Sequence, residues 1–417
     1  LVFAGTNNDP QKLFFSKSGD FENMTTGTNA TDGMTFTIGS DQVNAIKYIK
    51  GLRTLLIGTT GGEFVATASS SAEPITPTNI QIKRQAGYGT SDVDALLAGN
   101  RVLFVQRAGK KVRELVFDFN SDGYVAPDLT ILAEHIGGSG VGTGFTNWTY
   151  QQEPDSIVWV VRSDGVLTGM TYQRSENVVA WHRHILGGAF GNGIAEVESV
   201  AAISNTVTSS RGEDTLYMIV KRTVNGSTVR YIEYLQPFDF GSNIEDAWFL
   251  DSGLLYSGSA TTTLSGLSHL EGQTVSILAN GSTHADKVVS SGAISLDRSV
   301  TKAIVGLKYT SKLQTMRIES GSADGSAQGK VKRIQEITAR FFETVGAEIG
   351  SNSTQTDLIP FRDSSMAMDQ AVKLFSGDKQ IEFNSDYETD GFVYIQQEQP
   401  LPMTITALFP QLNTYDG

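Results

Sequence analysis

The sequence predicts a mainly β protein, in which a β-propeller is followed by smaller β-barrel or sandwich domains. Short apolar runs repeatedly meet a turn and return as a second apolar run, which is typical of β-hairpins. Successive units begin at Leu55, Val102, Ile157 and Leu216, at intervals of 47, 55 and 59 positions. Four-stranded propeller blades recur at about 40 to 50 residues, and longer loops would lengthen that interval. The composition, with 43 Gly and 10 Pro, fits many turns.

The stretch Leu55–Ala66 shows the unit most clearly. Its apolar run is too short for an ordinary helix, and Phe64 and Ala66 alternate with their neighbours as in a half-buried strand. We expect Gly61-Gly62 to form a two-residue turn, because such turns require a positive φ that glycine adopts without strain.

Comparable hairpins follow along the first half of the chain. Asn225-Gly226 is the strongest turn signal, because both residues tolerate positive φ. The predicted strand pairs are Val102–Gln106 with Val112–Phe117, Ile157–Arg162 with Val166–Tyr172, Leu216–Arg222 with Thr228–Leu235, and Leu1–Ala4 with Leu13–Lys17; Ile75–Gln85 is an outer strand.

The character of the sequence changes after Leu235, where alternation weakens. Ser259–Ser265 has the Thr/Ser composition of a linker, and Ser320–Gly329 is expected to be a flexible loop. We therefore predict propeller blades over residues 1–238, a crossover linker over 239–262, a small β-barrel or sandwich over 263–330, and a C-terminal β-rich domain over 331–417.

Short strands are expected throughout the second half. The pattern of Ile334–Val345 fits a helix or a strand, and we favour a strand. Pro400 and Pro402 exclude a helix before the last strand and favour an edge strand or a strand start. The remaining predicted strands are Leu267–Leu278, Lys287–Leu296, Lys302–Tyr309, Met403–Phe409, and the pair Ile381–Phe383 with Phe392–Gln396 around an acidic turn.

Length and composition limit the functional classes. A chain of 417 residues is expected to form two or three domains. Cysteine is absent, which excludes disulfides, thiolate zinc sites and cysteine nucleophiles. The net charge of −13 disfavours tight binding to nucleic acid, although it suits a wall past which DNA slides. No apolar run reaches the length of a membrane span. Because Leu1 already lies in a strand-like segment, we expect further residues upstream.

Two acidic segments resemble calcium-binding loops. The first contains Asp118, Asn120, Asp122 and Gly123, which matches the opening of an EF-hand loop. Its twelfth position is Leu129 instead of a bidentate Glu. We therefore favour a turn from hairpin to helix, with Asp128 capping a helix over Leu129–His135. The run Asp386, Glu388, Asp390, Gly391 lies between two strands and is interpreted in the same way.

His182 and His184 are the remaining candidate metal ligands. On a strand they share one face, as two ligands of a metal would. No third ligand is identifiable, so a polar strand face is favoured. Five aromatic residues nearby could form a sugar-binding platform, but blade core is the favoured interpretation; they are Trp148, Tyr150, Trp159, Tyr172 and Trp181.

Catalytic motifs are missing from the sequence. It contains no GxSxG, HExxH or GxxxxGK[ST] pattern. With 45 acidic residues, spacing alone identifies no glycosidase pair. We accordingly assign no catalytic, cofactor-binding or metal residue, expect no cofactor, and predict that the protein is not an enzyme.

The order of segments resembles a known family. The chain is similar to the tail nozzle, or tail tubular protein B, type of tail-hub protein from short-tailed bacteriophages. The segments that carry the resemblance are Leu1–Phe21, Ala45–Gly62, Val125–Ile136, Val229–Asp239, Asp251–Gly258, Leu264–Gly281, Val305–Glu319 and Gln399–Leu412.

The resemblance implies a structural subunit of the virion tail. Copies would form a sixfold ring below the portal, contact tail adaptor and fibre proteins, retain packaged DNA, and guide its non-specific passage during ejection. Such a conduit predicts an acidic inner wall. The alternative hypothesis is a propeller that binds or cleaves host-surface glycans, which predicts an aromatic-lined cleft with a carboxylate pair or Arg cluster. A scaffold propeller for protein partners shares most features with the first hypothesis.

Overall fold

The computed structural model describes residues 1–39, 43–70, 73–140, 142–204, 212–319, 326–368 and 370–415. The protein is mainly β, as predicted, with 54% strand and 3% helix. Contacts divide it into two compact units. Unit 1 contains residues 1–184, 196–220 and 231–235, and unit 2 contains 185–195, 221–230 and 236–417. Among the described residues, no helix is long and apolar enough to cross a membrane.

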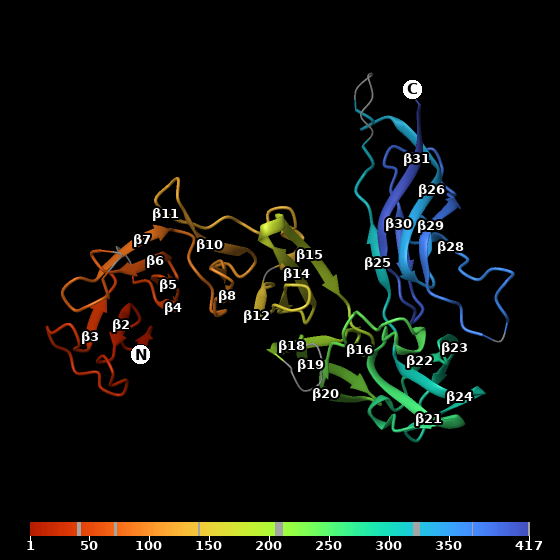
Figure 1. Cartoon of the computed structure of the whole chain (residues 1–417), viewed down its shortest axis with the longest axis horizontal. Helices are drawn as coiled ribbons and strands as arrows, with labels where there is room; N and C mark the ends of the chain where they lie inside the picture. The colour runs from red at the N-terminus through yellow and green to blue at the C-terminus, as the bar shows by residue number, and fades with distance from the viewer. Residues whose placement is uncertain are drawn as a thin grey trace. The chain divides into compact units, whose positions relative to one another are not determined.

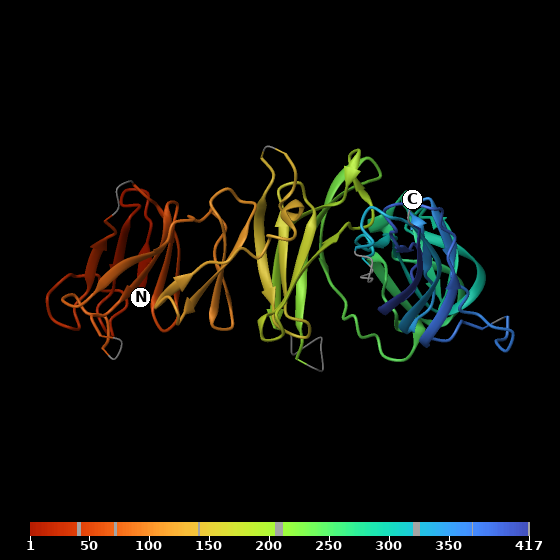
Figure 2. The same cartoon turned by 90° about the horizontal axis from the view of Figure 1, so that it is seen from above.

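Unit 1 is built from antiparallel sheets that follow one another along the chain (Figure 1). The order of strands is β1-β2-β3, β4-β5-β6-β7, β11-β10-β9-β8, β12-β13-β14-β15 and β18-β19-β20, of which residues 221–230, around the β19–β20 turn, are counted with unit 2. In Figure 2 the yellow strands of the fourth sheet are seen side by side. The bounds are β1 (Val2–Ala4), β2 (Lys12–Phe15), β3 (Met34–Thr37), β4 (Ile46–Gly51), β5 (Leu55–Thr59), β6 (Gly62–Thr67), β7 (Gln81–Ala86), β8 (Leu96–Ala98), β9 (Arg101–Val105), β10 (Val112–Asp118), β11 (Gly123–Val125), β12 (Phe145–Gln151), β13 (Ile157–Arg162), β14 (Leu167–Gln173), β15 (Val178–His184), β18 (Glu196–Ser204), β19 (Asp214–Val224) and β20 (Ser227–Tyr234).

The middle sheets of unit 1 are buried on both faces. Side chains alternate along a strand, so neighbours point to opposite faces. In β5, Leu56 packs in the core shared with the β8–β11 sheet, whereas Ile57 packs in the core shared with the β1–β3 sheet. In β9, Phe104 and Leu103 are divided between two cores in the same manner. This explains why these strands are continuous apolar runs.

The predicted hairpins of unit 1 are confirmed, with one correction. Thr59 pairs with Gly62, so the turn consists of Thr60 and Gly61. Neither Gly61 nor Gly62 has the predicted positive φ. Close packing requires glycine instead, because a β-carbon at Gly61 would overlap the amide of Asn44, and one at Gly62 would lie 2.6 Å from the carbonyl oxygen of Ala86.

The predicted helix over Leu129–His135 is wrong. Only a 3-10 turn, η1 (Glu134–Gly137), forms there, and its N-cap residue Ala133 makes no side-chain cap. Asp128 accepts a hydrogen bond from the backbone N–H of Thr130 at 2.8 Å, which makes a local turn. The next residue, Leu129, is fixed by a different contact, since the indole N–H of Trp181 donates a hydrogen bond to its carbonyl oxygen at 2.9 Å. A second 3-10 turn, η2 (Arg174–Glu176), precedes β15.

Unit 2 begins with the small pair β16 (Ala189–Phe190) and β17 (Gly193–Ile194), followed by a sheet of order β21-β24-β22-β23. Its strands are β21 (Asp251–Ser265), β22 (Thr274–Ala279), β23 (Ser282–Val288) and β24 (Ala293–Leu307), with 3-10 turns η3 (Ile244–Asp246) and η4 (Ser268–Leu270).

The predicted linker over 239–262 is wrong from residue 251, where β21 begins, and the linker interpretation of Ser259–Ser265 is wrong too. Thr261, Thr263 and Ser265 pair with β24, and most Thr and Ser side chains of the segment are exposed, so their polarity reflects a solvent-facing strand. Likewise, Lys287–Leu296 is no single strand, because it spans the turn between β23 and β24.

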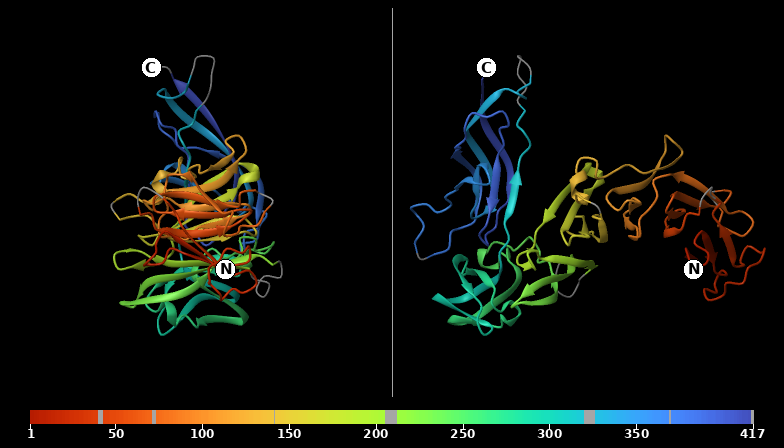
Figure 3. Two further views of the ribbon diagram at one scale, coloured as in Figure 1. Left: turned by 90° about the vertical axis from the view of Figure 1, so that its left-hand side faces the viewer. Right: turned by 180° about the vertical axis from the view of Figure 1, so that it is seen from behind.

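The last part of unit 2 contains two sheets that share one core. Their orders are β25-β30-β27-β28 and β29-β26-β31, and in Figure 3 the strands coloured cyan to dark blue run alongside one another. The strands are β25 (Ser311–Gln314), β26 (Val331–Thr344), β27 (Glu348–Asn352), β28 (Gln355–Leu358), β29 (Phe375–Glu382), β30 (Tyr394–Gln397) and β31 (Ile405–Tyr415). β26 confirms the strand favoured over Ile334–Val345, and β31 lies at a sheet edge, as the prolines before it predicted.

The predicted pairing of Ile381–Phe383 with Phe392–Gln396 is wrong. Ile381 lies in β29 and pairs with β26, whereas Tyr394 and Ile395 lie in β30 of the other sheet. Burial explains the difference, because Phe383 and Val393 both enter the core between the sheets while the acidic segment between them crosses from one sheet to the other. β25 also belongs with the C-terminal strands, since it pairs with β30 across the predicted boundary at residue 330. Of the predicted loop Ser320–Gly329, residues 320–325 lie outside the described residues.

Candidate functional site

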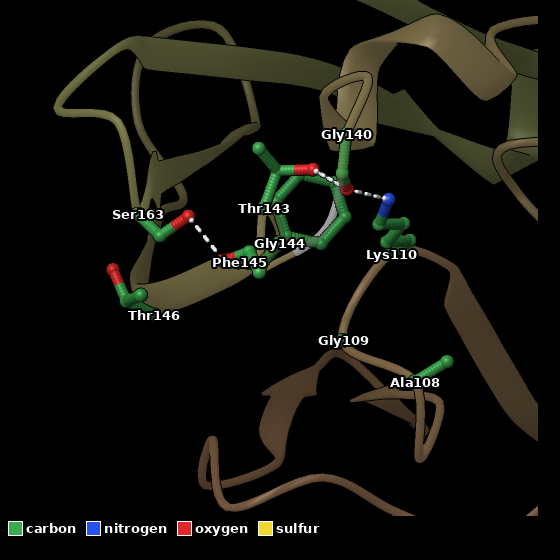
Figure 4. Close-up of a pocket in the computed structure, with 10 residues that line it drawn as sticks. Ala108, Gly109, Lys110, Gly140, Thr143, Gly144, Phe145, Thr146 and Ser163 are labelled. Carbon is green, nitrogen blue, oxygen red and sulfur yellow. Dashed lines mark hydrogen bonds between the residues drawn. The ribbon is translucent and has the colours of Figure 1, made fainter.

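A surface hollow of about 520 Å³ lies in unit 1, between glycine-rich loops (Figure 4). Its polar side chains are engaged with the backbone: Lys110 Nζ donates to the carbonyl oxygen of Gly140 at 2.8 Å, as does Thr143 Oγ1 at 2.9 Å. Ser163 Oγ donates to the carbonyl oxygen of Gly142 at 3.2 Å. Lys110 is the charged member of the described lining, so these residues supply no acid–base pair.

A second hollow, of about 440 Å³, lies in unit 2 beside β28 and β29. Two of its charged side chains, Lys379 and Asp378, are engaged. Lys379 Nζ donates to the carbonyl oxygen of Pro360 at 2.8 Å, and Asp378 accepts two hydrogen bonds from Arg340, at 2.7 and 2.9 Å. The Arg340 contact holds the pKa of the Asp378 carboxyl below its usual value. These contacts are suited to holding neighbouring segments of the chain together.

The buried charged side chains of unit 1 lie between its sheets. Glu114 on β10 is fully buried and forms an ion pair with Arg101. Its Oε2 accepts a hydrogen bond from the Tyr172 hydroxyl at 2.8 Å and lies 3.0 Å from Arg174 Nε. Burial raises the pKa of Tyr172, and the nearby Glu114 charge raises it further. A carboxylate balanced by two guanidinium groups is a structural ion cluster that ties consecutive sheets together.

A second buried carboxyl, that of Glu63 on β6, forms no ion pair with a basic side chain among the described residues. Its Oε2 accepts a hydrogen bond from the Tyr88 backbone N–H at 3.3 Å. Its Oε1, the Tyr48 hydroxyl and Thr90 Oγ1 are buried without a hydrogen-bond partner among the described residues. Burial raises the pKa of Glu63 to about 6, an effect that backbone hydrogen bonds and the Arg113 charge partly offset.

The predicted histidine pair is brought together. His182 and His184 lie on one face of β15, with His182 Nδ1 2.7 Å from His184 Nε2. Trp159 packs against both rings and donates its indole N–H to Gln151 Oε1 at 2.7 Å. Within the described ranges, no cluster of three His, Cys, Asp or Glu side chains could hold a metal ion.

Residues of both acidic segments are engaged in contacts within the protein. Asp118 accepts hydrogen bonds from the backbone N–H groups of Asn120 and Ser121, which shape the turn between β10 and β11. In the second segment Asp390 lies 2.7 Å from Arg317 Nε, and Glu388 pairs through its backbone with Lys332. The described contacts therefore assemble structural turns in both places.

The aromatic residues considered for a sugar-binding platform belong to a hydrophobic core, as favoured. Trp148, Trp159 and Tyr172 are buried, and Tyr150 and Trp181 pack against the same core as Trp148 and Tyr172. The buried Glu63 and Glu114 were missed by sequence reasoning. The available signal was a single acidic residue within an otherwise apolar strand, as in Gly62-Glu63-Phe64.

Comparison with known proteins identifies no family. No family model and no curated protein matches the chain. Among solved structures, an auxiliary nutrient-binding protein from Bacteroides thetaiotaomicron has a TM-score of 0.29 and 10% identity, over 55% of this chain and 56% of its own. An exo-β-1,3-galactanase from Phanerochaete chrysosporium has a TM-score of 0.26 and 9% identity, over 99% and 94% of the two chains. The N-terminal domain of Nup159 has a TM-score of 0.26 and 12% identity, over 78% and 77%.

Proposed function

We propose that the chain is a structural subunit of a short-tailed bacteriophage tail, of the nozzle or tail-hub type. In this proposal unit 1 is a set of propeller blades, and copies of the chain form a sixfold ring that retains packaged DNA and guides its ejection. The chain acts through its shape and charge, without catalysis. The succession of sheets buried on both faces supports the blade interpretation.

The observation that carries the proposal is an exposed cluster of apolar and aromatic side chains on the β19–β20 hairpin. The Asn225-Gly226 turn and the hydrogen bond from Leu235 N–H to the Leu216 carbonyl set the register of β19 and β20. That register places Ile219 opposite Ile232, and Tyr217 opposite Tyr234, whose ring centroids are 5.8 Å apart.

These four side chains are apolar or aromatic, and most of them are exposed. Ile232 is 78% exposed and Tyr234 is 53% exposed, whereas Leu216 and Val220 on the opposite face are buried. An exposed apolar patch on a sheet is typical of a protein–protein interface. A structural ring requires such a surface between neighbouring subunits, and a net charge of −13 suits a conduit that must not hold DNA.

The alternative of a glycan-binding or glycan-cleaving propeller has less support. It requires an aromatic-lined cleft, whereas the aromatic residues considered for it are packed in the core. Neither surface hollow has a carboxylate pair free of a basic partner in its described lining. Binding of the purified chain to a host-glycan array, with loss of binding after substitution in one hollow, would favour this alternative.

The decisive test is the composition of purified virions from the source. Quantitative mass spectrometry should find this chain at half the copy number of the portal subunit, among tail adaptor and fibre proteins. Its absence from particles would overturn the proposal. In parallel, Ile232→Asp should lower the fraction of assembled protein in light-scattering measurements. Leu132→Asp is the matched control, because Leu132 is 96% exposed in a loop outside that cluster.

A further inference from the structure

The two imidazole rings on β15 form a preorganised pair. His182 and His184 are two positions apart, so their side chains project from the same face of the strand. The ring centroids are 4.9 Å apart with planes at 83°, and His182 Nδ1 lies 2.7 Å from His184 Nε2. Both residues are half-buried, so neither is fully enclosed by the protein.

A glycine on the neighbouring strand permits this geometry. Gly169 on β14 pairs with His182, and a β-carbon at Gly169 would overlap the imidazole. The His182 ring therefore lies across β14 towards Trp159 on β13, which pairs with Gly169 from the other side. The indole centroid lies 5.7 Å from the His182 ring and 5.0 Å from the His184 ring. Packing thus holds both rings in place.

The tautomers of the two rings decide which nitrogens can bind a metal. A neutral imidazole has one protonated nitrogen and one nitrogen with a free lone pair. The Thr171 hydroxyl lies 3.5 Å from His182 Nε2, which suits the tautomer that leaves Nδ1 unprotonated. His182 Nδ1 then accepts a hydrogen bond from His184 Nε2–H. When a metal ion binds Nε2, this proton moves to Nδ1 of the same ring, so the His184 ring stays neutral.

We propose that His182 Nδ1 and His184 Nε2 chelate a divalent transition-metal ion of the class that prefers imidazole: Cu²⁺, Ni²⁺ or Zn²⁺. Metal–imidazole bonds of about 2.0–2.1 Å require the two nitrogens to be about 3 Å apart, which is a small opening of the present pair. Water completes the coordination. For a given set of nitrogen ligands, the affinity for divalent transition metals is highest for Cu²⁺ and lower for Ni²⁺ and Zn²⁺. Cu²⁺ therefore binds this pair most tightly. This inference does not depend on the proposed tail function.

Trp159 provides a direct measurement of binding. Cu²⁺ alone, added to the full chain at pH 7, should quench the fluorescence of this nearby indole at low ion concentration, and excess Zn²⁺ should reverse the quenching. His182→Asn and His184→Asn should each weaken Cu²⁺ binding by about tenfold or more, because each removes one arm of the chelate. His135→Asn is the matched control, since His135 is exposed on η1 and should leave the affinity unchanged.

Electron paramagnetic resonance of the Cu²⁺-loaded wild-type chain tests the proposal even if a variant does not fold. At one equivalent of Cu²⁺, the spectrum should contain hyperfine splitting from two imidazole nitrogens. A spectrum with only oxygen ligands would overturn the proposal. Equal Cu²⁺ affinity in folded wild-type, His182→Asn and His184→Asn proteins would overturn it too.

Discussion

The phenol ring of Tyr48 lies across the backbone of Gly58, in the space that a β-carbon at position 58 would occupy. Tyr48 on β4, Gly58 on β5 and Glu63 on β6 are consecutive cross-strand partners, so the absence of a side chain in the middle lets the ring reach towards Glu63. His182, Gly169 and Trp159 repeat this arrangement on another sheet. In both cases a mid-strand glycine makes room for a ring that carries a polar group.

Substituting Gly58 by Ala should destabilise unit 1, although alanine is the smallest change available. The new β-carbon would force the Tyr48 ring off its position between the sheets, at a cost of about 1–3 kcal/mol. Chemical denaturation followed by circular dichroism measures the loss. Gly51→Ala on β4 is the control, because a β-carbon there would meet no atom within 4 Å. Equal stability of the two variants would contradict the proposed role of Gly58.

Glu63 should make unit 1 less stable as the pH rises from 4.5 to 6. Burial raises the pKa of the folded carboxyl to about 6 from its usual value of 4.5, so the folded state binds the proton more tightly than the unfolded state. The stabilisation is fully present below pH 4.5 and is lost as the pH passes 6, by about 2 kcal/mol in total. Glu63→Gln should remove this contribution to the pH dependence and leave the contributions of other groups.

The matched control for Glu63 is Glu73→Gln, which changes an exposed carboxyl of the same unit. Denaturation midpoints measured at intervals across pH 4 to 7 would compare the two variants with the wild type. If Glu63→Gln and Glu73→Gln have the same pH dependence, the carboxyl of Glu63 is not the group responsible.

Removing the charge of Glu114 should cost more than removing a single hydrogen bond. Glu114→Gln leaves Arg101 and Arg174 without their buried counter-charge, which we expect to destabilise unit 1 by about 3 kcal/mol. Tyr172→Phe removes one hydrogen bond of 2.8 Å and should cost about 1–2 kcal/mol. The partly exposed pair of Asp9 and Lys12 is the control, and Asp9→Asn should cost less than about 1 kcal/mol. Equal losses in all three variants would contradict this ranking.

The features that the sequence could predict are local ones. Asn225-Gly226 identifies its hairpin because both residues have positive φ, at 47° and 74°. The alternation in Ile334–Val345 identifies β26 because one set of side chains must enter a core. A period of two positions and a turn with special backbone angles are both contained within about a dozen residues.

The features that the sequence could not predict depend on distant partners. Ile381 and Tyr394 are close in sequence, yet they pair in different sheets because the intervening residues cross the core. Gly58 and Gly169 resemble any glycine in a strand, and their importance becomes visible only when the ring on the neighbouring strand is known. The same holds for Glu63, whose burial depends on the sheet that covers it.

His184 should have the opposite pH dependence to Glu63. Its pKa of about 4 in the folded chain lies below the usual 6.5, because burial disfavours the charged ring. The unfolded chain therefore binds the proton more tightly. The stabilisation from neutral His184 is present above pH 6.5 and is lost as the pH falls towards 4, by about 3 kcal/mol in total.

The two effects oppose each other between pH 4.5 and 6, so each becomes visible when the other is removed. Stability should rise with pH in Glu63→Gln and fall with pH in His184→Gln, whereas His135→Gln should follow the wild type. Nuclear magnetic resonance of the ring protons gives the His184 pKa directly. A His184 ring that titrates near 6.5 would contradict its neutral, packed state, because a ring free to accept a proton there cannot be held against Trp159 at the cost that burial imposes.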